Sequence, residues 1–145
     1  MEEYLYAELT KKIIGAFFTV RNILGYGFLE KVYENALKIE LEKQGYQVNQ
    51  QKPINVYYEK IPVGEYYADL VVNDEVILEL KSVDCLCEEH EAQLINYLRA
   101  SEMKVGLLLN FGKKVEVRRK ISSRKMERFD ERQLRIKQQS IDPES

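Results

Sequence analysis

The chain has little of several residue types, and each shortage excludes a class of protein. Among 145 residues there are two cysteines, three prolines, one histidine and no tryptophan. Two cysteines cannot form the disulfide framework of a small secreted domain, and a chain of this length with 45% hydrophobic residues can bury a core without one. No apolar run approaches the roughly 18 residues that span a bilayer. We therefore expect no membrane segment.

The start of the sequence is acidic. Met1-Glu2-Glu3 lacks the basic and then apolar plan of a signal peptide, so we expect a cytoplasmic protein with reduced cysteines. Cys85, Cys87 and His90 stand close together, but structural zinc takes four ligands and iron–sulfur clusters need four cysteines. The default interpretation is two loop cysteines without a metal.

Charge is unevenly distributed along the chain. The net charge is −2, yet residues 113–137 carry 11 basic and 4 acidic side chains, against 11 and 18 in residues 1–112. Such a basic stretch can neutralise phosphates. The alternative is a soluble, salt-bridged helix with Glu127, Asp130 and Glu131 interleaved, and composition does not choose between the two. The candidate nucleic-acid contacts here are Arg118, Arg119, Lys120, Arg124 and Lys125.

The hydrophobic pattern predicts one α/β domain. We expect helices at about 3–24, 28–44 and 88–102, and strands at about 47–58, 66–72, 76–81, 104–111 and 114–121. Pro53 favours an edge or irregular position for the first strand. The apolar run 105–109 favours a central strand. The expected organisation is one domain over residues 1–121, with two helices before a mixed sheet, and a basic, polar tail over 122–145.

Two of these strands form a hairpin that carries charges in an apolar setting. With a three-residue turn, the pairs would be Val72 with Val76, Leu70 with Leu78, Ala68 with Leu80, and Asp69 with Glu79. One face would then be apolar, and Asp69, Glu79 and Lys81 would gather on the other. Neighbouring carboxylates destabilise a sheet unless something positive lies between them. The pattern predicts a divalent cation or a substrate phosphate, and a solvated hairpin is the alternative.

The order of these motifs resembles the PD-(D/E)XK nuclease superfamily. The matching residues are Glu30 on a helix, Asp69 on a strand, Glu79-Leu80-Lys81 on the next strand, and Gln93-Leu94-Ile95-Asn96-Tyr97 on a later helix, as in RecB-like members with a Q-x-x-x-Y helix. More narrowly, Gly27-Phe28-Leu29-Glu30-Lys31-Val32-Tyr33 and Gly64-Glu65-Tyr66-Tyr67-Ala68-Asp69 look like the small GxxExxY proteins. Ala68 stands where the "PD" motif has proline. The resemblance implies a restriction-endonuclease-like core.

The resemblance also implies metal-dependent hydrolysis of phosphodiester bonds. Asp69 and Glu79 would bind Mg²⁺ or Mn²⁺, with the Leu80 backbone carbonyl as a third ligand. Lys81 would orient the attacking water or take its proton. Glu30 is expected to border the apolar stripe of its helix and to bind the metal or support a ligand, although the helix dipole alone could explain an acid there. Glu34, one turn later, is expected to be a surface acid.

The third predicted helix carries a polar stripe of His90, Gln93 and Tyr97 beside four residues expected to be buried, Ala92, Leu94, Ile95 and Leu98. Gln93 would donate to a phosphate oxygen or hold a catalytic carboxylate. Tyr97 would stack on a base or contact the backbone of the nucleic acid. Both could instead be satisfied by hydrogen bonds within the protein. His90 ranks below them, as a nucleic-acid contact or a helix cap.

Two function classes fit the sequence. One is a metal-dependent nuclease, and the other is a nuclease-fold module that binds nucleic acid or a protein partner with little or no turnover. The intact set of Asp69, Glu79 and Lys81 favours the nuclease. DNA is favoured over RNA as the partner. A chain of this length has little room for a target-reading domain, so specificity is expected from a partner, a homodimer or the shape of the substrate.

Overall fold

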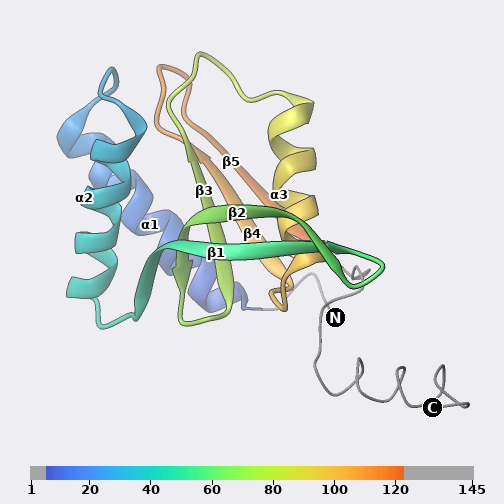
Figure 1. The fold of residues 1–145 in the computed structure, drawn as a ribbon. Coiled ribbons are helices and arrows are strands. Elements are labelled where there is room, and N and C mark those ends of the chain that lie inside the picture. Colours follow the sequence, from blue (N-terminus) through green and yellow to red (C-terminus); the bar gives the residue numbers. More distant parts are fainter. Residues whose placement is uncertain (1–5, 123–145) are drawn as a thin grey trace, which may run out of the picture.

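The computed structural model describes residues 6–122, which form one five-stranded sheet with helices on both faces (Figure 1). The elements are α1 (Ala7–Leu24), α2 (Glu30–Lys43), β1 (Val48–Tyr58), β2 (Ile61–Val72), β3 (Val76–Lys81), α3 (Glu88–Ala100), β4 (Val105–Asn110) and β5 (Glu116–Ile121). The strands lie in chain order, and within these residues β3 and β4 form the parallel pair, since α3 returns the chain across the sheet. The predicted mixed α/β sheet preceded by two helices is confirmed.

The positions of two strands also agree with the sequence pattern. β1, which contains Pro53, is an edge strand, and β4 is buried throughout between β3 and β5. β2 differs from the prediction because it begins at Ile61. It pairs with β1 along most of its length but with β3 only from Leu70 to Val72. The two strands therefore leave the sheet together as a ribbon, which we call the β1–β2 ribbon (residues 52–68).

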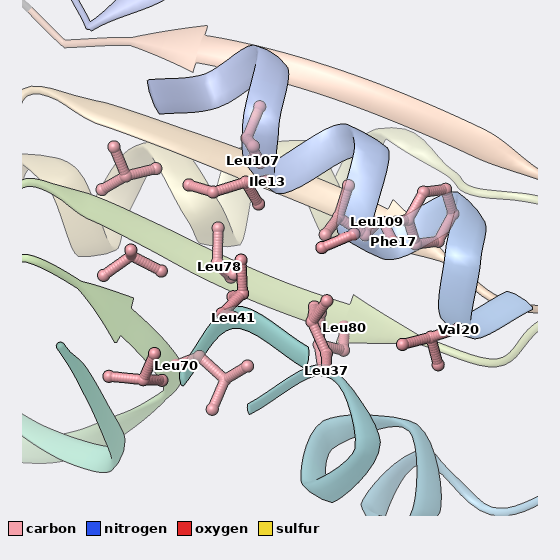
Figure 2. Close-up of a cluster of buried hydrophobic side chains, with 14 of the residues drawn as sticks. Ile13, Phe17, Val20, Leu37, Leu41, Leu70, Leu78, Leu80, Leu107 and Leu109 are labelled. Atoms are coloured by element: carbon pink, nitrogen blue, oxygen red, sulfur yellow. The ribbon is translucent and has the colours of Figure 1, made fainter. Parts of the chain in front are cut away.

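One hydrophobic core lies between the sheet and helices α1 and α2 (Figure 2). The helices contribute side chains at helical spacing, and the strands contribute every second residue. These are Ile13, Phe17, Val20, Leu37 and Leu41 from the helices, and Leu70, Leu78, Leu80, Leu107 and Leu109 from the strands. Burial of each such side chain contributes about 1.5–3 kcal/mol. The core supports the sheet from behind and leaves its other face for α3.

Tyr33 connects this core to the loop between α1 and α2. Its ring stacks on Phe111 with the centroids 4.5 Å apart. Its hydroxyl donates to the Gly25 carbonyl at 2.7 Å and accepts from the Phe28 N–H at 3.3 Å. Gly25 and Gly27 have φ angles of 72° and 109°, which residues other than glycine rarely adopt. The tyrosine thus fixes the loop that leads into the start of α2.

A second core packs α3 against the opposite face of the sheet. Leu94 and Leu98 are buried there as predicted, and Gly106 of β4 allows a close approach, because an added Cβ would lie 2.7 Å from Leu94 Cδ1. Two burial predictions for α3 are wrong, since Ala92 is exposed and Ile95 is only half-buried. No helix within residues 6–122 is long and apolar enough to cross a membrane.

Ala68 also belongs to this second core, whereas Leu70 belongs to the first core on the opposite face of the sheet. The prediction that Ala68 and Leu70 share one face is therefore wrong. Ala68 and Val71 both pack on the α3 side, although residues three apart in a regular strand point to opposite faces. The alternation of β2 is therefore interrupted between them. Asp69 lies at this interruption.

Candidate active site

Asp69 and Glu79 lie side by side where β2 separates from β3. The pairs Val72–Val76 and Leu70–Leu78 confirm the predicted three-residue turn. The backbone pairing ends there and does not continue to the predicted pairs Asp69–Glu79 and Ala68–Leu80. Instead, the Leu80 N–H donates to Asp69 Oδ2 at 2.8 Å, and the Asp69 N–H donates to Glu79 Oε1 at 3.4 Å. The two side chains take over the role of backbone acceptors, which holds the carboxylates together.

Both carboxyls resist ionisation. Glu79 is 7% exposed, and burial followed by the charge of Asp69 raises its pKa to about 9. Burial also raises the pKa of Asp69, against the lowering effect of the Leu80 N–H, and the charges of Glu34 and Glu30 raise it further. At neutral pH the pair favours one bound proton over two charges. A site of this kind is stabilised when a cation arrives.

Glu34 belongs to the group of acids around the Asp69–Glu79 pair, so the prediction that Glu34 is a surface acid is wrong. It is 4% exposed and accepts hydrogen bonds from Lys31 Nζ at 2.9 Å and from Gln51 Nε2 at 3.0 Å. Gln50 Nε2 makes a further, short contact with it. The available sequence signal was the i+4 spacing from Glu30, which places both acids on neighbouring turns of α2.

Gln51 links two of the carboxylates. The Nε2 atom that donates to Glu34 also lies 3.4 Å from Asp69 Oδ1. The backbone of Gln51 has φ of 55° inside β1, where the regular pairing with β2 is interrupted. A non-glycine residue in this conformation costs on the order of 1–3 kcal/mol, and such strain gathers at functional sites. No sequence signal identifies Gln51, because glutamine carries no preference for this conformation.

Glu30 and Lys81 stand at the ends of their elements. Glu30 begins α2 and is exposed, which corrects the prediction that it borders the apolar stripe. Its charge nevertheless acts on Asp69. Lys81 ends β3, is half-buried, and lowers the pKa of Glu79 through its positive charge. The structure thus brings Glu30, Lys81 and the Asp69–Glu79 pair within electrostatic reach of one another.

Asn110 and Gly112 fix the segment that follows Lys81. The fully buried Asn110 side chain accepts from the Val83 N–H at 3.0 Å and donates to the Val83 and Lys114 carbonyls, both at 2.9 Å. Gly112 packs so closely that an added Cβ would lie 1.8 Å from the Val83 oxygen. Lys81 therefore leads into an anchored segment of backbone.

Tyr97 is the α3 residue on which the charges of the Asp69–Glu79 pair act. It is 8% exposed, and burial, followed by the charges of Glu79 and Asp69, raises its pKa to about 12. Gln93 is exposed and hydrogen-bonds to Tyr97 through its side chain. Of the three residues in the polar stripe predicted for α3, Tyr97 therefore approaches the carboxylate pair, and Gln93 lies beside Tyr97.

His90 caps α3. Its Nδ1 accepts from the Cys87 N–H at 3.2 Å and lies 3.4 Å from Cys87 Sγ. Cys85 and Cys87 are free and exposed. The capping contact accounts for this histidine structurally, and its role as a nucleic-acid contact stays a prediction.

Arg118 and Lys120 of β5 have acidic partners. Arg118 lies 2.8 Å from Glu116, and Lys120 pairs with Glu91 of α3. Arg119 lies between them on the strand, while Arg124 and Lys125 fall outside the described residues. Arg118 and Lys120 thus have ion-pair partners within the protein, and their contact with nucleic acid stays a prediction, while the alternative of a helix with Glu127, Asp130 and Glu131 falls outside the described residues.

The oxygen atoms at this centre fit a hard divalent cation. Two adjacent carboxylates, one with a strongly raised pKa, are the ligand type that Mg²⁺ and Mn²⁺ prefer. Within residues 6–122, no three His, Cys, Asp or Glu side chains are grouped closely enough to hold an ion by themselves. A backbone carbonyl such as that of Leu80, together with water, would complete the shell. Magnesium commonly keeps several of its waters.

Comparison with known families matches residues 7–121 to the PD-(D/E)XK nuclease superfamily. The chain belongs to this superfamily. No curated protein matches it. The crystal structure of a protein named SSO0001 is similar, with a TM-score of 0.50 and 16% identity over 96% of this chain and 68% of that one. At this identity the likeness supports the fold alone, and the narrower resemblance to GxxExxY proteins stays a prediction.

Proposed function

We propose that the protein is a metal-dependent nuclease that hydrolyses phosphodiester bonds in nucleic acid. The observation that carries the proposal is the buried Asp69–Glu79 pair, in which burial and mutual repulsion raise the pKa of Glu79 to about 9. A module that only binds a partner gains nothing from this repulsion. A nuclease needs such a pair to concentrate cation-binding oxygens at one point.

Asp69 and Glu79 would hold Mg²⁺ or Mn²⁺, with the Leu80 carbonyl as the candidate third ligand and Glu30 as a further one. When bound, the ion would neutralise charge on the phosphate and lower the pKa of water. The Leu80 N–H and the Gln51 amide keep the Asp69 carboxylate in one orientation. Preorganised ligands of this kind need no rearrangement during the reaction.

Two side chains would act on the water and the phosphate. Lys81, held beside Glu79, would orient the attacking water or take its proton, and its ammonium form offsets phosphate charge. Gln93 would donate to a phosphate oxygen from α3. Both act from elements that the buried cores hold in place, which favours a fixed geometry over a mobile one.

One observation favours the second candidate, a nuclease-fold binding module with little turnover. The described residues contain no group of three side-chain ligands for one ion, and Glu30, the expected additional acid, is exposed. In that case nucleic acid would bind without cleavage in either Mg²⁺ or Mn²⁺.

Incubation with labelled single- and double-stranded DNA and RNA in Mn²⁺, in Mg²⁺ and in EDTA separates the two candidates. We expect metal-dependent cleavage that falls roughly 100-fold or more in Asp69→Asn and in Lys81→Ala. Lys43→Ala, at an exposed position in the last turn of α2, is the matched control and should cleave like the wild type. Binding without cleavage of any substrate, or full activity in Asp69→Asn, would contradict the nuclease proposal.

A further inference from the structure

A groove of about 380 Å³ lies between the β1–β2 ribbon and α3. Val56 and Tyr66 of the ribbon form one side, and Gln93, Asn96 and Tyr97 of α3 form the other. Figure 1 shows the ribbon passing below the foot of α3. The groove therefore lies where the ribbon, having separated from β3, faces α3.

The groove adjoins the carboxylate pair. Tyr66 and Tyr97 pack against each other with ring centroids 5.5 Å apart and the planes inclined by 42°. Tyr97 is 8% exposed, whereas Tyr66 is 47% exposed. Burial and the charges of Glu79 and Asp69 raise the pKa of Tyr97. Tyr97 thus forms the inner end, next to the candidate active site. Tyr66 leaves part of its aromatic surface open to a ligand.

The chemistry of the groove fits a nucleobase better than a phosphate. None of the described residues that line it is lysine or arginine, and the lining includes the Glu89 carboxylate. A hydrogen bond from the Cys87 side chain lowers the pKa of Glu89, so this wall is negatively charged at neutral pH. Gln93 and Asn96 add amide donors and acceptors. Aromatic surface for stacking, with amides and a carboxylate for exocyclic amines, matches the flat faces and polar edge of a base.

We infer that this groove binds an unpaired nucleobase of the substrate, so that the substrate is a single-stranded nucleic acid. The inference rests on the proposed function, because it assigns the base to a strand whose phosphate lies at the Asp69–Glu79 pair. A base inside a duplex is paired and stacked, and would have to leave the helix to enter the groove. An unpaired base enters without that cost.

The test measures binding apart from cleavage, by fluorescence anisotropy in EDTA. The probes are a fluorescein-labelled DNA single strand, the same strand in a duplex, and a single strand of abasic deoxyribose phosphates of equal length. We expect the single strand to bind more tightly than the other two. Tyr66→Ala should weaken its binding roughly 5- to 150-fold, the range that corresponds to loss of one base–aromatic stack.

Matched variants control for charge, area and folding. Tyr67→Ala removes a neighbouring ring that is 49% exposed and does not line the groove, and should bind like the wild type. Tyr66→Phe keeps the ring and should also retain binding. Tyr66→Leu keeps apolar bulk without the ring, so it tests stacking even if the alanine variant is poorly folded. It should lose affinity as the alanine variant does.

Three results would overturn the inference: equal affinity for the single strand and the duplex, equal affinity for the abasic strand, or equal losses in Tyr66→Ala and Tyr67→Ala. These differ from failure of the nuclease proposal. A single-strand preference that depends on Tyr66, without cleavage in Mn²⁺, would keep the groove and refute the nuclease. Cleavage by a protein that binds duplex and single strand equally would do the reverse.

Discussion

Replacing Glu79 by glutamine is expected to stabilise the metal-free protein at neutral pH. Folding raises the pKa of this carboxyl from 4.5 to about 9. Between these two values the folded protein keeps a proton that the unfolded chain releases, so the free energy of unfolding falls as pH rises. The slope is about 1.4 kcal/mol per pH unit, which amounts to about 3 kcal/mol lost between pH 4.5 and 7. Glutamine has the same shape, can still accept from the Asp69 N–H, and does not titrate.

Urea unfolding in EDTA measures this effect directly. The variant should exceed the wild type in free energy of unfolding by about 3 kcal/mol at pH 7, and by much less near pH 5. In a chain of 145 residues this corresponds to a rise in Tm of roughly 6–12 °C. Added Mg²⁺ should raise the Tm of the wild type and have a smaller effect on the variant, because one ligand is lost.

The control is Glu59→Gln, an exposed position at the tip of the β1–β2 ribbon, for which we expect no comparable gain with pH. If the unfolding free energies of wild type and Glu79→Gln ran parallel from pH 5 to pH 8, Glu79 would not be held protonated by its surroundings. The reasoning about the carboxylate pair would then be refuted.

Three further predictions concern the residues that support the site. Gln51→Gly should be more stable than Gln51→Ala by about 1 kcal/mol, because φ at this position is 55°, and both should cleave roughly 10-fold more slowly; Tm and cleavage rates check this. Gly112→Ala should destabilise the protein by more than about 3 kcal/mol or prevent folding, because the added Cβ would meet the Val83 oxygen. Gly15→Ala, where an added Cβ has nothing within 4 Å, should instead stabilise α1 by about 0.5–1 kcal/mol, and urea unfolding checks both. Tyr33→Phe should lower the unfolding free energy by about 1 kcal/mol through loss of its hydroxyl hydrogen bonds, and an unchanged Tm would count against that role.

The hairpin register could be predicted because the apolar residues around its turn leave one good solution. A two-residue turn would instead move Leu70 and Leu78 onto different faces of the sheet. The point where β2 separates from β3 could not be predicted in this way. It depends on the conformation of Gln51 and on the packing of Ala68 toward α3, and neither has a signal in local sequence.

The exposures of Glu30 and Glu34 are the reverse of those expected. Helical spacing from Tyr33 and Leu37 placed Glu30 beside the apolar stripe. The helix begins at Glu30, however, where the side chain is exposed, and Glu34 is the acid that reaches Gln50 and Gln51 of β1. Periodicity gives the phase of a helix, but it does not show where a neighbouring strand covers it.

The β1–β2 ribbon has a dynamic consequence. Over most of residues 52–68 each strand has a partner on one side only, whereas β4 has a strand on both sides along its whole length and β3 is paired with β4 along its whole length. The amide protons of the ribbon should exchange with solvent through local opening, while those of the central strand β4 exchange only when the whole domain unfolds. The ribbon that carries Tyr66 can therefore open locally while β3, which carries Glu79, stays paired with β4, so a ligand can enter without displacing the Glu79 carboxylate.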